Sequence, residues 1–380
     1  MKLRPAFLFL SLFILLCCQT VQAQDALGLF NEGVKYKEQK KPKEALEKFR
    51  QALEINPDYP DAWYESGWCQ NDLRDYKGAI VSLRKARNGW PRYAKVHFEL
   101  GYAFEKTEQT DSAIAAYRKC LEISATYSGA YRQLGYIAYD KDDYEAGLGY
   151  FRDYEKNAKT ASADYLYWYR KGFMMNATKQ YDSAKVALQK SLDLKKDYIN
   201  TYLELGFAAT KLKQADEAIG YFNSAITIDP KSHIPYNGIG EVYRDVKKDM
   251  DMSMYWYGKT LQLNSNERKA NFGMGYCLNS KGKYTEAIPY LRKAIASEDT
   301  YTAAYVELGY SLYKTQSYSE AEIKLLKALS LNPKNENAHY YLILLYVSLR
   351  DKTNAQKWLN SLRALNSRYV AELEPKVNAL

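Results

Sequence analysis

Residues 201–230 read TYLELGFAATKLKQADEAIGYFNSAITIDP, and their apolar side chains return every three or four positions. Residues at this spacing share one face of an α-helix, so the stretch predicts two helices that pack together. Glycine inside a helix costs about 1 kcal/mol relative to alanine. We therefore expect Gly206 to permit a close approach of the two helices, with the small Ala218 as the facing surface. Pro230 lacks an N–H group and ends the second helix.

The same pattern recurs along the chain. Successive glycines are mostly 34 residues apart, with one step of 37 and one of 35 residues. They are Gly33, Gly67, Gly101, Gly135, Gly172, Gly206, Gly240, Gly275 and Gly309. Because each unit predicts a pair of packed helices, we expect an all-α chain of about ten helix hairpins stacked in order.

These residues resemble the tetratricopeptide repeat, a family with a 34-residue pattern of aromatic, Leu-Gly, Ala and Pro positions. The best-matching unit carries Leu205, Gly206, Ala218, Phe222, Ala225 and Pro230. The resemblance covers residues 26 to about 369 and implies an α-solenoid, a right-handed superhelix of hairpins. The last unit has Ile343 where the glycine belongs, and residues 370–380 are expected to form a short capping helix.

Two irregular steps interrupt the period. Three extra residues near 162–164 produce the 37-residue step, so we expect a joint near residues 155–164 of an array that spans residues 24–369. The 35-residue step falls around residues 249–252 and predicts a hairpin turn that is one residue longer.

The N-terminus predicts export. Lys2 and Arg4 precede an apolar run from Phe7 to Cys18, and a small residue, Ala23, follows. This order is typical of a signal peptide, here residues 1–23, and the run is too short to span a bilayer comfortably. We therefore expect a periplasmic or secreted protein. The alternatives are a retained N-terminal anchor and lipidation at Cys17 or Cys18, which would attach the chain to a membrane.

Charge and cysteine content argue against several functions. Lys and Arg outnumber Asp and Glu by 54 to 45, but the signs alternate, so nucleic-acid binding is not expected. Cys69, Cys120 and Cys277 are scattered, as are the three histidines, and predict neither a disulfide framework nor a metal site. No catalytic set or phosphate-binding loop is recognisable, so we expect neither an enzyme nor a cofactor.

The resemblance also indicates where a partner would bind. In the resembled family, the residue after the glycine and the residue three before it generally face a concave groove. After the glycine the chain has Trp68, Tyr102, Tyr136, Phe173, Phe207, Tyr276 and Tyr310. Three before the glycine it has Tyr64, Phe98 and Tyr169, as well as Phe30 and Phe272. We expect an aromatic-lined groove, although packing between hairpins is an equal alternative for the second set.

An aromatic groove favours a protein or peptide partner, either an extended segment or an apolar helix, and the face of a sugar is the weaker alternative. Glu65, Glu99, Glu204 and Glu307 stand two positions before the glycine and predict an acidic row that would attract a basic partner. Two other functions stay open: a structural subunit of a cell-envelope assembly, and a helical-repeat protein that binds or processes glycans. The sequence leaves the oligomeric state open.

Overall fold

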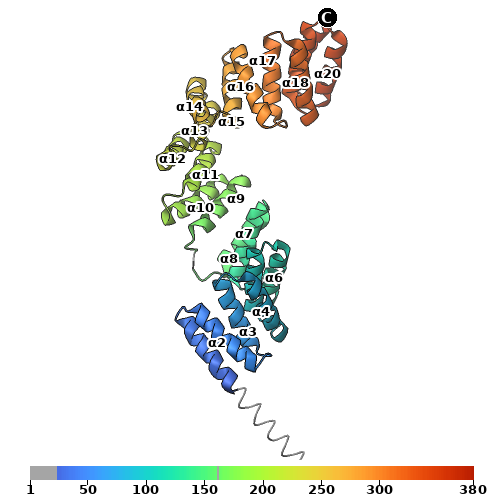
Figure 1. The fold of residues 1–380 in the computed structure, drawn as a ribbon. Helices are drawn as coiled ribbons and strands as arrows, with labels where there is room; N and C mark the ends of the chain where they lie inside the picture. Colours follow the sequence, from blue (N-terminus) through green and yellow to red (C-terminus); the bar gives the residue numbers. More distant parts are fainter. Residues whose placement is uncertain (1–23, 161) are drawn as a thin grey trace, which may run out of the picture. The chain divides into compact units, whose positions relative to one another are not determined.

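The computed structural model describes residues 24–160 and 162–380, and the expected signal peptide lies outside this part. The chain divides into two compact units, the first ending at Ala163 and the second beginning at Asp164. In the first unit the helices are residues 24–38, α2 (Pro42–Ile55), α3 (Pro60–Asp72), α4 (Tyr76–Gly89), α5 (Ala94–Lys106), α6 (Thr110–Ile123), α7 (Ser128–Asp140) and α8 (Tyr144–Asn157) (Figure 1).

The second unit continues the same series. Its helices are α9 (Tyr165–Ala177), α10 (Tyr181–Leu194), α11 (Ile199–Lys211), α12 (Ala215–Ile228), α13 (Ile234–Val242), the π-helix η1 (Tyr243–Lys247), α14 (Met250–Leu263), α15 (Arg268–Ser280), α16 (Tyr284–Ser297), α17 (Thr302–Lys314), α18 (Tyr318–Leu331), α19 (Glu336–Ser348), α20 (Lys352–Ala364) and α21 (Val370–Asn378). All regular elements among the described residues are helices. The expected all-α array of hairpins is therefore confirmed.

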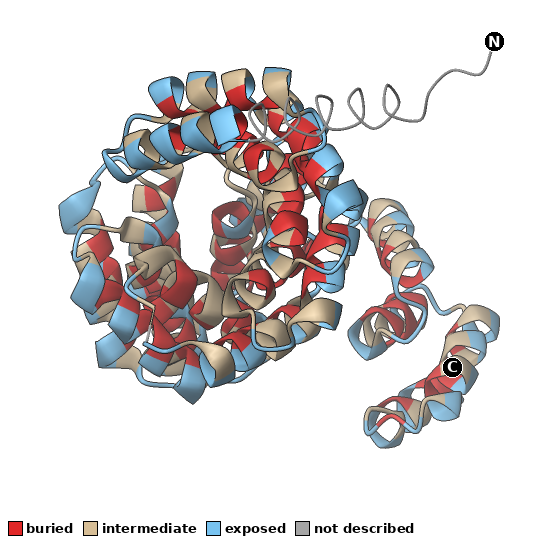
Figure 2. Ribbon diagram, turned by 90° about the horizontal axis from the view of Figure 1, so that it is seen from below, coloured by how far each residue is buried: buried red, intermediate tan, exposed pale blue. Residues whose placement is uncertain are grey.

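Each hairpin packs its two helices together and then packs against the next hairpin, as α3, α4 and α5 do. The first helices of neighbouring hairpins also touch, for example α3 with α5 and α17 with α19, whereas the second helices approach each other less. Within a unit, the first helices therefore lie on the inner side of the curve. Buried residues occupy the faces where helices meet, and exposed residues the outer faces (Figure 2).

The glycines permit the close helix approach that the sequence predicts. A Cβ atom on Gly206 would lie 2.6 Å from the Phe222 ring, and one on Gly67 would lie 2.5 Å from the Leu83 side chain. The group that fills the space is thus the large apolar residue sixteen positions later in the sequence. The small residues approach the glycines as well: a Cβ atom on Gly172 would lie 3.2 Å from the carbonyl oxygen of Ala184, and one on Gly309 would lie 3.4 Å from that of Ala321. The expectation that the small residue faces the glycine is therefore confirmed in these two hairpins, where the larger side chain lies closer still.

The hairpin turns have one backbone feature in common. Each contains a residue with positive φ: Lys40, Arg74, Glu108, Asp142, Lys179, Lys213, Lys248, Gly282, Gln316 and Arg350. After α3, the N–H of Asp75 donates to the carbonyl of Gln70 at 2.8 Å, which is the hydrogen bond that closes a Schellman turn. Gly282 is the one glycine among these ten turn residues.

The 35-residue step has a different origin from the one expected. The hairpin turn keeps its usual length, and the extra residue is absorbed in η1 at the end of α13. There the N–H of Asp249 donates to the carbonyl of Tyr243 at 2.9 Å, across a wider turn than an α-helix makes. The expectation of a longer hairpin turn is therefore wrong.

A long connection precedes the second unit, and a short helix closes its other end. Residues 158–164 connect α8 to α9, whereas residues 56–59 suffice between α2 and α3. At the other end, α21 packs on α19 and α20 and buries Leu373 and Val377 completely. Ile343, which replaces the repeat glycine in α19, is also fully buried.

Candidate functional site

Two of the residues that follow a repeat glycine line one cavity on the first helices of neighbouring hairpins. Trp68 of α3 and Tyr102 of α5 border a space of about 260 Å³ in the first unit. The other lining residues are Asn71, Asp72, Arg74, Tyr76 and Glu99. Trp68 and Tyr102 thus meet at one cavity on first helices, and we take this cavity as the candidate site.

Three aromatic rings and four polar or charged side chains, Asp72 and Arg74 among them, line the cavity, and two lysines lie beside the rings. The rings of Tyr76 and Tyr102 meet edge to face, with centroids 6.1 Å apart. The ammonium group of Lys106 lies 5.2 Å from the centroid of the Tyr102 ring, and that of Lys37 lies 4.3 Å from the Trp68 ring. Trp68 and Tyr102 are each half-buried, so one part of each ring packs and another part faces solvent.

A buried amide and a carboxylate join the two helices beside the cavity. The side-chain amide of Asn71 donates to the Glu99 carboxylate at 2.8 Å and to the Glu99 backbone carbonyl at 3.2 Å. Burial raises the pKa of Glu99, and the hydrogen bond from Asn71 opposes this shift only in part. Glu65 is likewise engaged, by Lys37 at 2.5 Å. Glu99 and Glu65 are therefore partnered within the protein, which argues against the expected acidic row as an attraction for a basic partner.

The same arrangement occurs twice more in the second unit. Asn176 donates to the Glu204 carboxylate at 2.8 Å, and Asn279 donates to the Glu307 carboxylate at 2.9 Å. The equivalents of Trp68 are Phe173 and Tyr276, and the equivalents of Tyr102 are Phe207 and Tyr310. Lys211 lies 5.1 Å from the Phe207 ring, and Lys314 lies 5.4 Å from the Tyr284 ring.

The sequence does contain a signal for this arrangement, but the signal returns only in every third hairpin and does not follow the 34-residue period. The segments ELGYAFEK (99–106), ELGFAATK (204–211) and ELGYSLYK (307–314) recur 105 and 103 residues apart, which is every third hairpin. The asparagines Asn71, Asn176 and Asn279 recur with the same steps. A comparison at three times the basic period would have found both.

Tyr136 belongs to a hairpin outside this arrangement. It is half-buried on α7, and its ring meets the buried Phe151 ring edge to face with centroids 5.7 Å apart. The positions equivalent to Glu99 and Lys106 hold Gln133 and Asp140 in this hairpin. Tyr136 therefore lies on a first helix, as expected.

The aromatic residues three before the glycine have packing partners in the next hairpin. Tyr64 pairs with Tyr93, Phe98 with Tyr127 and Tyr169 with Tyr198, each at 4.9 to 5.5 Å between centroids. Phe30 and Phe272 pair with tyrosines in the same way. Tyr64 is only 9% exposed, so it belongs to the core rather than to a groove surface. Phe98 and Tyr169 are half-buried, and the packing alternative describes their main contacts.

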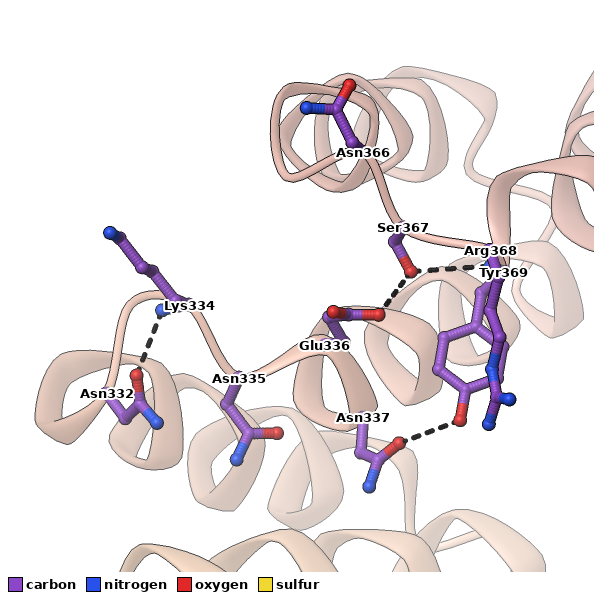
Figure 3. Close-up of a pocket in the computed structure, with 9 residues that line it drawn as sticks. All are labelled: Asn332, Lys334, Asn335, Glu336, Asn337, Asn366, Ser367, Arg368 and Tyr369. Atoms are coloured by element: carbon purple, nitrogen blue, oxygen red, sulfur yellow. Dashed lines mark hydrogen bonds between the residues drawn. The ribbon is translucent and has the colours of Figure 1, made fainter.

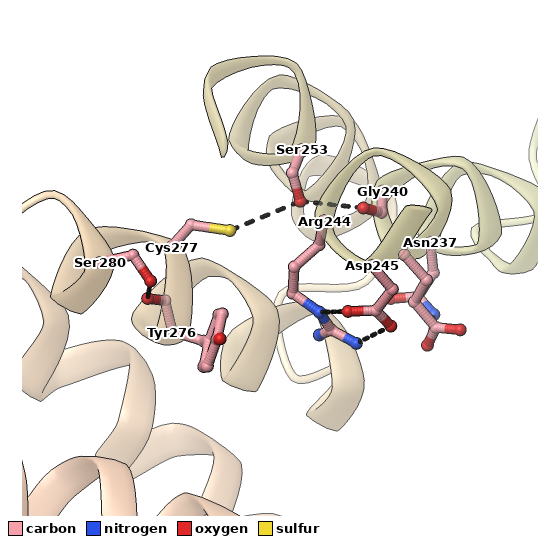
Figure 4. A network of polar contacts seen from close by, with 9 residues as sticks. Asn237, Gly240, Arg244, Asp245, Ser253, Tyr276, Cys277 and Ser280 are labelled. Carbon is pink, nitrogen blue, oxygen red and sulfur yellow. Dashed lines mark hydrogen bonds and ion pairs between the residues drawn. The ribbon is translucent and has the colours of Figure 1, made fainter. Parts of the chain in front are cut away.

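Arg244 in the π-helix lies beside the copy of the arrangement that contains Tyr276 and Tyr310. Its guanidinium group donates to both carboxylate oxygens of Asp245, at 2.7 and 2.8 Å (Figure 4). The same group lies 5.8 Å from the rings of Phe272 and Tyr276. Burial alone would lower the pKa of Arg244, but the hydrogen bonds to Asp245 outweigh it and raise the pKa. A cation thus stands beside the Tyr276 ring in this copy.

A second cavity, of about 610 Å³, lies among the loops near α19 and α21. Its side chains bind one another: Ser367 donates to Glu336 at 2.5 Å, and Tyr369 donates to Asn337 at 3.3 Å (Figure 3). Polar loop residues dominate its lining, and it shares no residue with the aromatic arrangement. We interpret it as a junction that fixes the loops.

The cysteines and two of the histidines are packed inside the array, as expected. Cys69, Cys120 and Cys277 are buried, and burial raises the pKa of the Cys69 and Cys120 thiols to about 12. His97 and His339 are buried as well. In the part of the chain that the structure describes, no three His, Cys, Asp or Glu side chains are grouped so as to bind a metal ion. No described helix has the length and apolar character needed to cross a bilayer.

The stacked hairpins define a helical-repeat scaffold. Family models for the tetratricopeptide repeat match residues 26–59, 94–127, 199–232 and 280–336. The chain therefore belongs to the tetratricopeptide repeat family, whose folds generally bind peptides or proteins.

Relatives are distant. The human protein O-mannosyl-transferase TMTC3 is 22% identical over 210 residues, which is 52% of this chain but only 22% of that protein. The solved structure of pilF from Pseudomonas aeruginosa superposes with a TM-score of 0.51 and 17% identity, covering 56% of this chain and 97% of that one. A tetratricopeptide repeat protein from Parabacteroides merdae gives a TM-score of 0.50 and 13% identity, covering 66% and 98%. These likenesses show the fold alone.

Proposed function

We propose that the protein is an exported, non-catalytic scaffold that binds extended protein or peptide segments along its aromatic groove. The observation that carries the proposal is the cavity of about 260 Å³ between Trp68 and Tyr102. Aromatic rings with one face accessible provide flat apolar area at little cost in conformational entropy, which suits an incoming side chain. The neighbouring polar groups, Asn71 and Glu99, are fixed by their own hydrogen bond and would keep the walls in place.

Affinity capture from the native cell envelope tests the proposal. We expect a specific protein to be captured by the wild type and lost with the double variant Trp68→Ala, Tyr102→Ala. Tyr255 is the matched control, because it is 53% exposed on α14, a second helix. Tyr255→Ala should leave capture unchanged, and circular dichroism should show equal helix content in all three proteins. Capture of the same proteins by the double variant would contradict groove binding.

A structural subunit of an envelope assembly is the second candidate, and one surface favours it. Gly89, Trp90, Pro91, Arg92 and Tyr93 line a cavity of about 530 Å³ in the loop between α4 and α5. This apolar loop surface lies at hairpin ends and could support lateral packing. Loss of the captured protein with Trp90→Ala, and not with the groove variant, would favour this candidate. The glycan-binding or glycan-processing alternative gains no specific observation.

Export is part of the proposal and has its own test. It is supported by the charged start, apolar run and Ala23 of the first 23 residues. Mass spectrometry of the protein from its native source should find a mature N-terminus at Gln24. A peptide that begins at Met1, or a lipid on Cys17 or Cys18, would contradict cleavage after Ala23.

A further inference from the structure

We propose that the groove carries three copies of one subsite, each of which binds an aromatic side chain next to an acidic side chain in an extended peptide. The inference rests on the proposed function and adds the number of subsites and the chemistry of the ligand. We name the copies by their second ring: the Tyr102, Phe207 and Tyr310 subsites. The first lies in the first unit, and the other two lie in the second unit.

Equivalent contacts define the three subsites. In each, a tyrosine at the start of a second helix meets the ring of the next first helix: Tyr76 with Tyr102 at 6.1 Å, Tyr181 with Phe207 at 6.2 Å and Tyr284 with Tyr310 at 5.5 Å. In each, an asparagine donates to a part-buried glutamate at 2.8 to 2.9 Å. Three separate places in the chain therefore share these two pairs. The Tyr310 subsite has one further ring, because Tyr310 also stacks on Tyr341 with centroids 4.5 Å apart.

The copies are not a by-product of the 34-residue repeat. The hairpins that hold Gly135 and Gly240 have Gln133 and Gly238 where the subsites have glutamate. They have Asp140 and Asp245 where the subsites have Lys106, Lys211 and Lys314. A first helix can thus stack in this array without the glutamate and the lysine, so their joint return in every third hairpin needs a reason beyond packing.

The lysines indicate the charge of the ligand. Lys106, Lys211 and Lys314 each end a first helix, and their ammonium groups lie 5.1 to 5.4 Å from a subsite ring. Lys106 also lies 3.3 Å from the carboxylate of its neighbour Glu105, an exposed contact for which a ligand carboxylate would compete. An ammonium group held beside an aromatic wall can pair with a carboxylate while the ring packs against an adjacent apolar side chain. The glutamates do not oppose such a ligand strongly, because each is tied to an asparagine and burial favours its neutral form.

Three weak subsites would act together on a partner that repeats the same element. When modules are linked, the second binding step becomes intramolecular, and the overall affinity can rise by about 10²-fold or more without a new contact. The predicted partner is therefore a chain with several aromatic-acidic elements, and a single element should bind weakly.

Synthetic peptides test the number and the chemistry of the subsites. The single probe is a fluorescein-labelled Gly-Ser peptide with one Phe-Glu pair. The tandem probe has three such pairs joined by linkers of about 20 Gly and Ser residues, which reach roughly 25 Å on average. Fluorescence anisotropy should give a dissociation constant for the tandem probe at least about 100-fold lower than for the single probe. Replacing Phe-Glu by Phe-Lys should abolish binding.

Variants of each subsite test equivalence. Tyr102→Ala, Phe207→Ala and Tyr310→Ala should each weaken tandem binding by about tenfold, by similar factors. Lys106→Glu, Lys211→Glu and Lys314→Glu change surface side chains, so these variants keep the fold and should each weaken binding by about fivefold. Lys43→Glu is the matched control, since Lys43 is exposed on the second helix α2, and it should have no effect.

Three results would overturn the proposal: no binding of either probe, equal affinities of the two probes, or loss of all binding through one subsite with no effect from the other two. Affinity capture with the same variants separates this failure from failure of the proposed function. If the native partner is still lost with groove variants, the groove binds protein but the three-subsite inference is wrong.

Discussion

At the scale of single residues, the asparagines of the three subsites differ in one hydrogen bond. The side-chain oxygen of Asn279 accepts from the hydroxyl of Ser311 at 2.6 Å. Among the described residues, the corresponding oxygens of Asn71 and Asn176 are buried without a hydrogen-bond partner. The positions equivalent to Ser311 hold Ala103 and Ala208, so the protein itself shows which substitution would complete the network.

We expect Ala208→Ser to stabilise the protein by about 1 kcal/mol, because it supplies a donor to a buried acceptor. Ser311→Ala should destabilise it by about 1 to 2 kcal/mol, because it removes that donor. Urea unfolding of both variants measures the effects. The larger Cys277 occupies the same position in another hairpin, so the space accepts one more atom. Equal stability of all three proteins would show that the unpaired oxygens carry no cost.

The buried glutamates predict a dependence of stability on pH. Burial raises the pKa of Glu204 above its ordinary value of 4.5, and the hydrogen bond from Asn176 offsets this only in part. The stability that this group contributes is therefore fully present below pH 4.5 and is lost as pH rises through the folded-state pKa. We expect Glu204→Gln to be more stable than the wild type at pH 7.5, with the difference vanishing in acid.

Glu372 supplies a control of opposite sign. The Lys376 hydrogen bond lowers the pKa of its exposed carboxyl group below 4.5, so its contribution is present above that pH and is lost as pH falls. Urea unfolding of Glu204→Gln and Glu372→Gln between pH 4 and pH 8 compares the two. Parallel stability curves for wild type and Glu204→Gln would refute the assignment.

At the scale of helices and turns, the sequence predicts the hairpins well because their two demands are local. A glycine must meet a large side chain sixteen residues later, and proline must end a helix, so both leave a fixed spacing. The contact between the Tyr64 and Tyr93 rings is harder to predict, because it lies between two hairpins. It depends on where the first helix of the next hairpin begins. The π-helix was missed because an extra residue in a helix and one in a turn give the same 35-residue step.

The glycines allow a paired test of helix contact. Gly206→Ala should destabilise the protein by about 1 to 3 kcal/mol, because the new Cβ atom would lie 2.6 Å from Phe222. A Cβ atom on Gly220, in α12, would have no atom within 4 Å. Gly220→Ala should therefore stabilise by about 0.5 to 1 kcal/mol through helix propensity alone. Thermal unfolding followed by circular dichroism measures both, and similar shifts in the two variants would contradict the contact argument.

The turns predict a second pair of effects. Lys213 has φ of 60°, a conformation that costs a residue with a Cβ atom about 1 kcal/mol, and Gly282 holds the same place with φ of 74°. Lys213→Gly should stabilise the protein by about 0.5 kcal/mol. Glycine relieves the cost of the positive φ, but it also gives the unfolded chain more conformational freedom, which offsets part of the gain. Gly282→Lys should destabilise it by a similar amount. Loss of stability in Lys213→Gly would show that the lysine side chain matters more than the backbone.

At the scale of the whole molecule, the chain passes from one compact unit to the other within residues 158–164. Proteases need an extended segment, and this is a longer connection than residues 56–59 between α2 and α3. Lys159 is exposed in it. We expect brief trypsin treatment to cut first after Lys159 and to leave two fragments that remain helical. Mass spectrometry identifies the cut, and a first cut inside either unit would contradict a division at this place.

The 37-residue spacing of Gly135 and Gly172 predicts an irregular step in this region. The expected bend or loosened joint at residues 155–164 stays a prediction. The candidate site is predicted only in part. The rings of Trp68 and Tyr102 were found because they follow the glycine directly. The asparagine and lysine of each subsite were not, because neither is part of the family pattern and both return only in every third hairpin.

The turn residues with positive φ have a practical consequence. Six of them are trypsin sites: Lys40, Arg74, Lys179, Lys213, Lys248 and Arg350. When heat opens one hairpin, its own turn becomes a substrate, and the cut leaves a fragment whose mass identifies that hairpin. Digestion at rising temperature would thus map the order in which the array comes apart, without any label or added mutation.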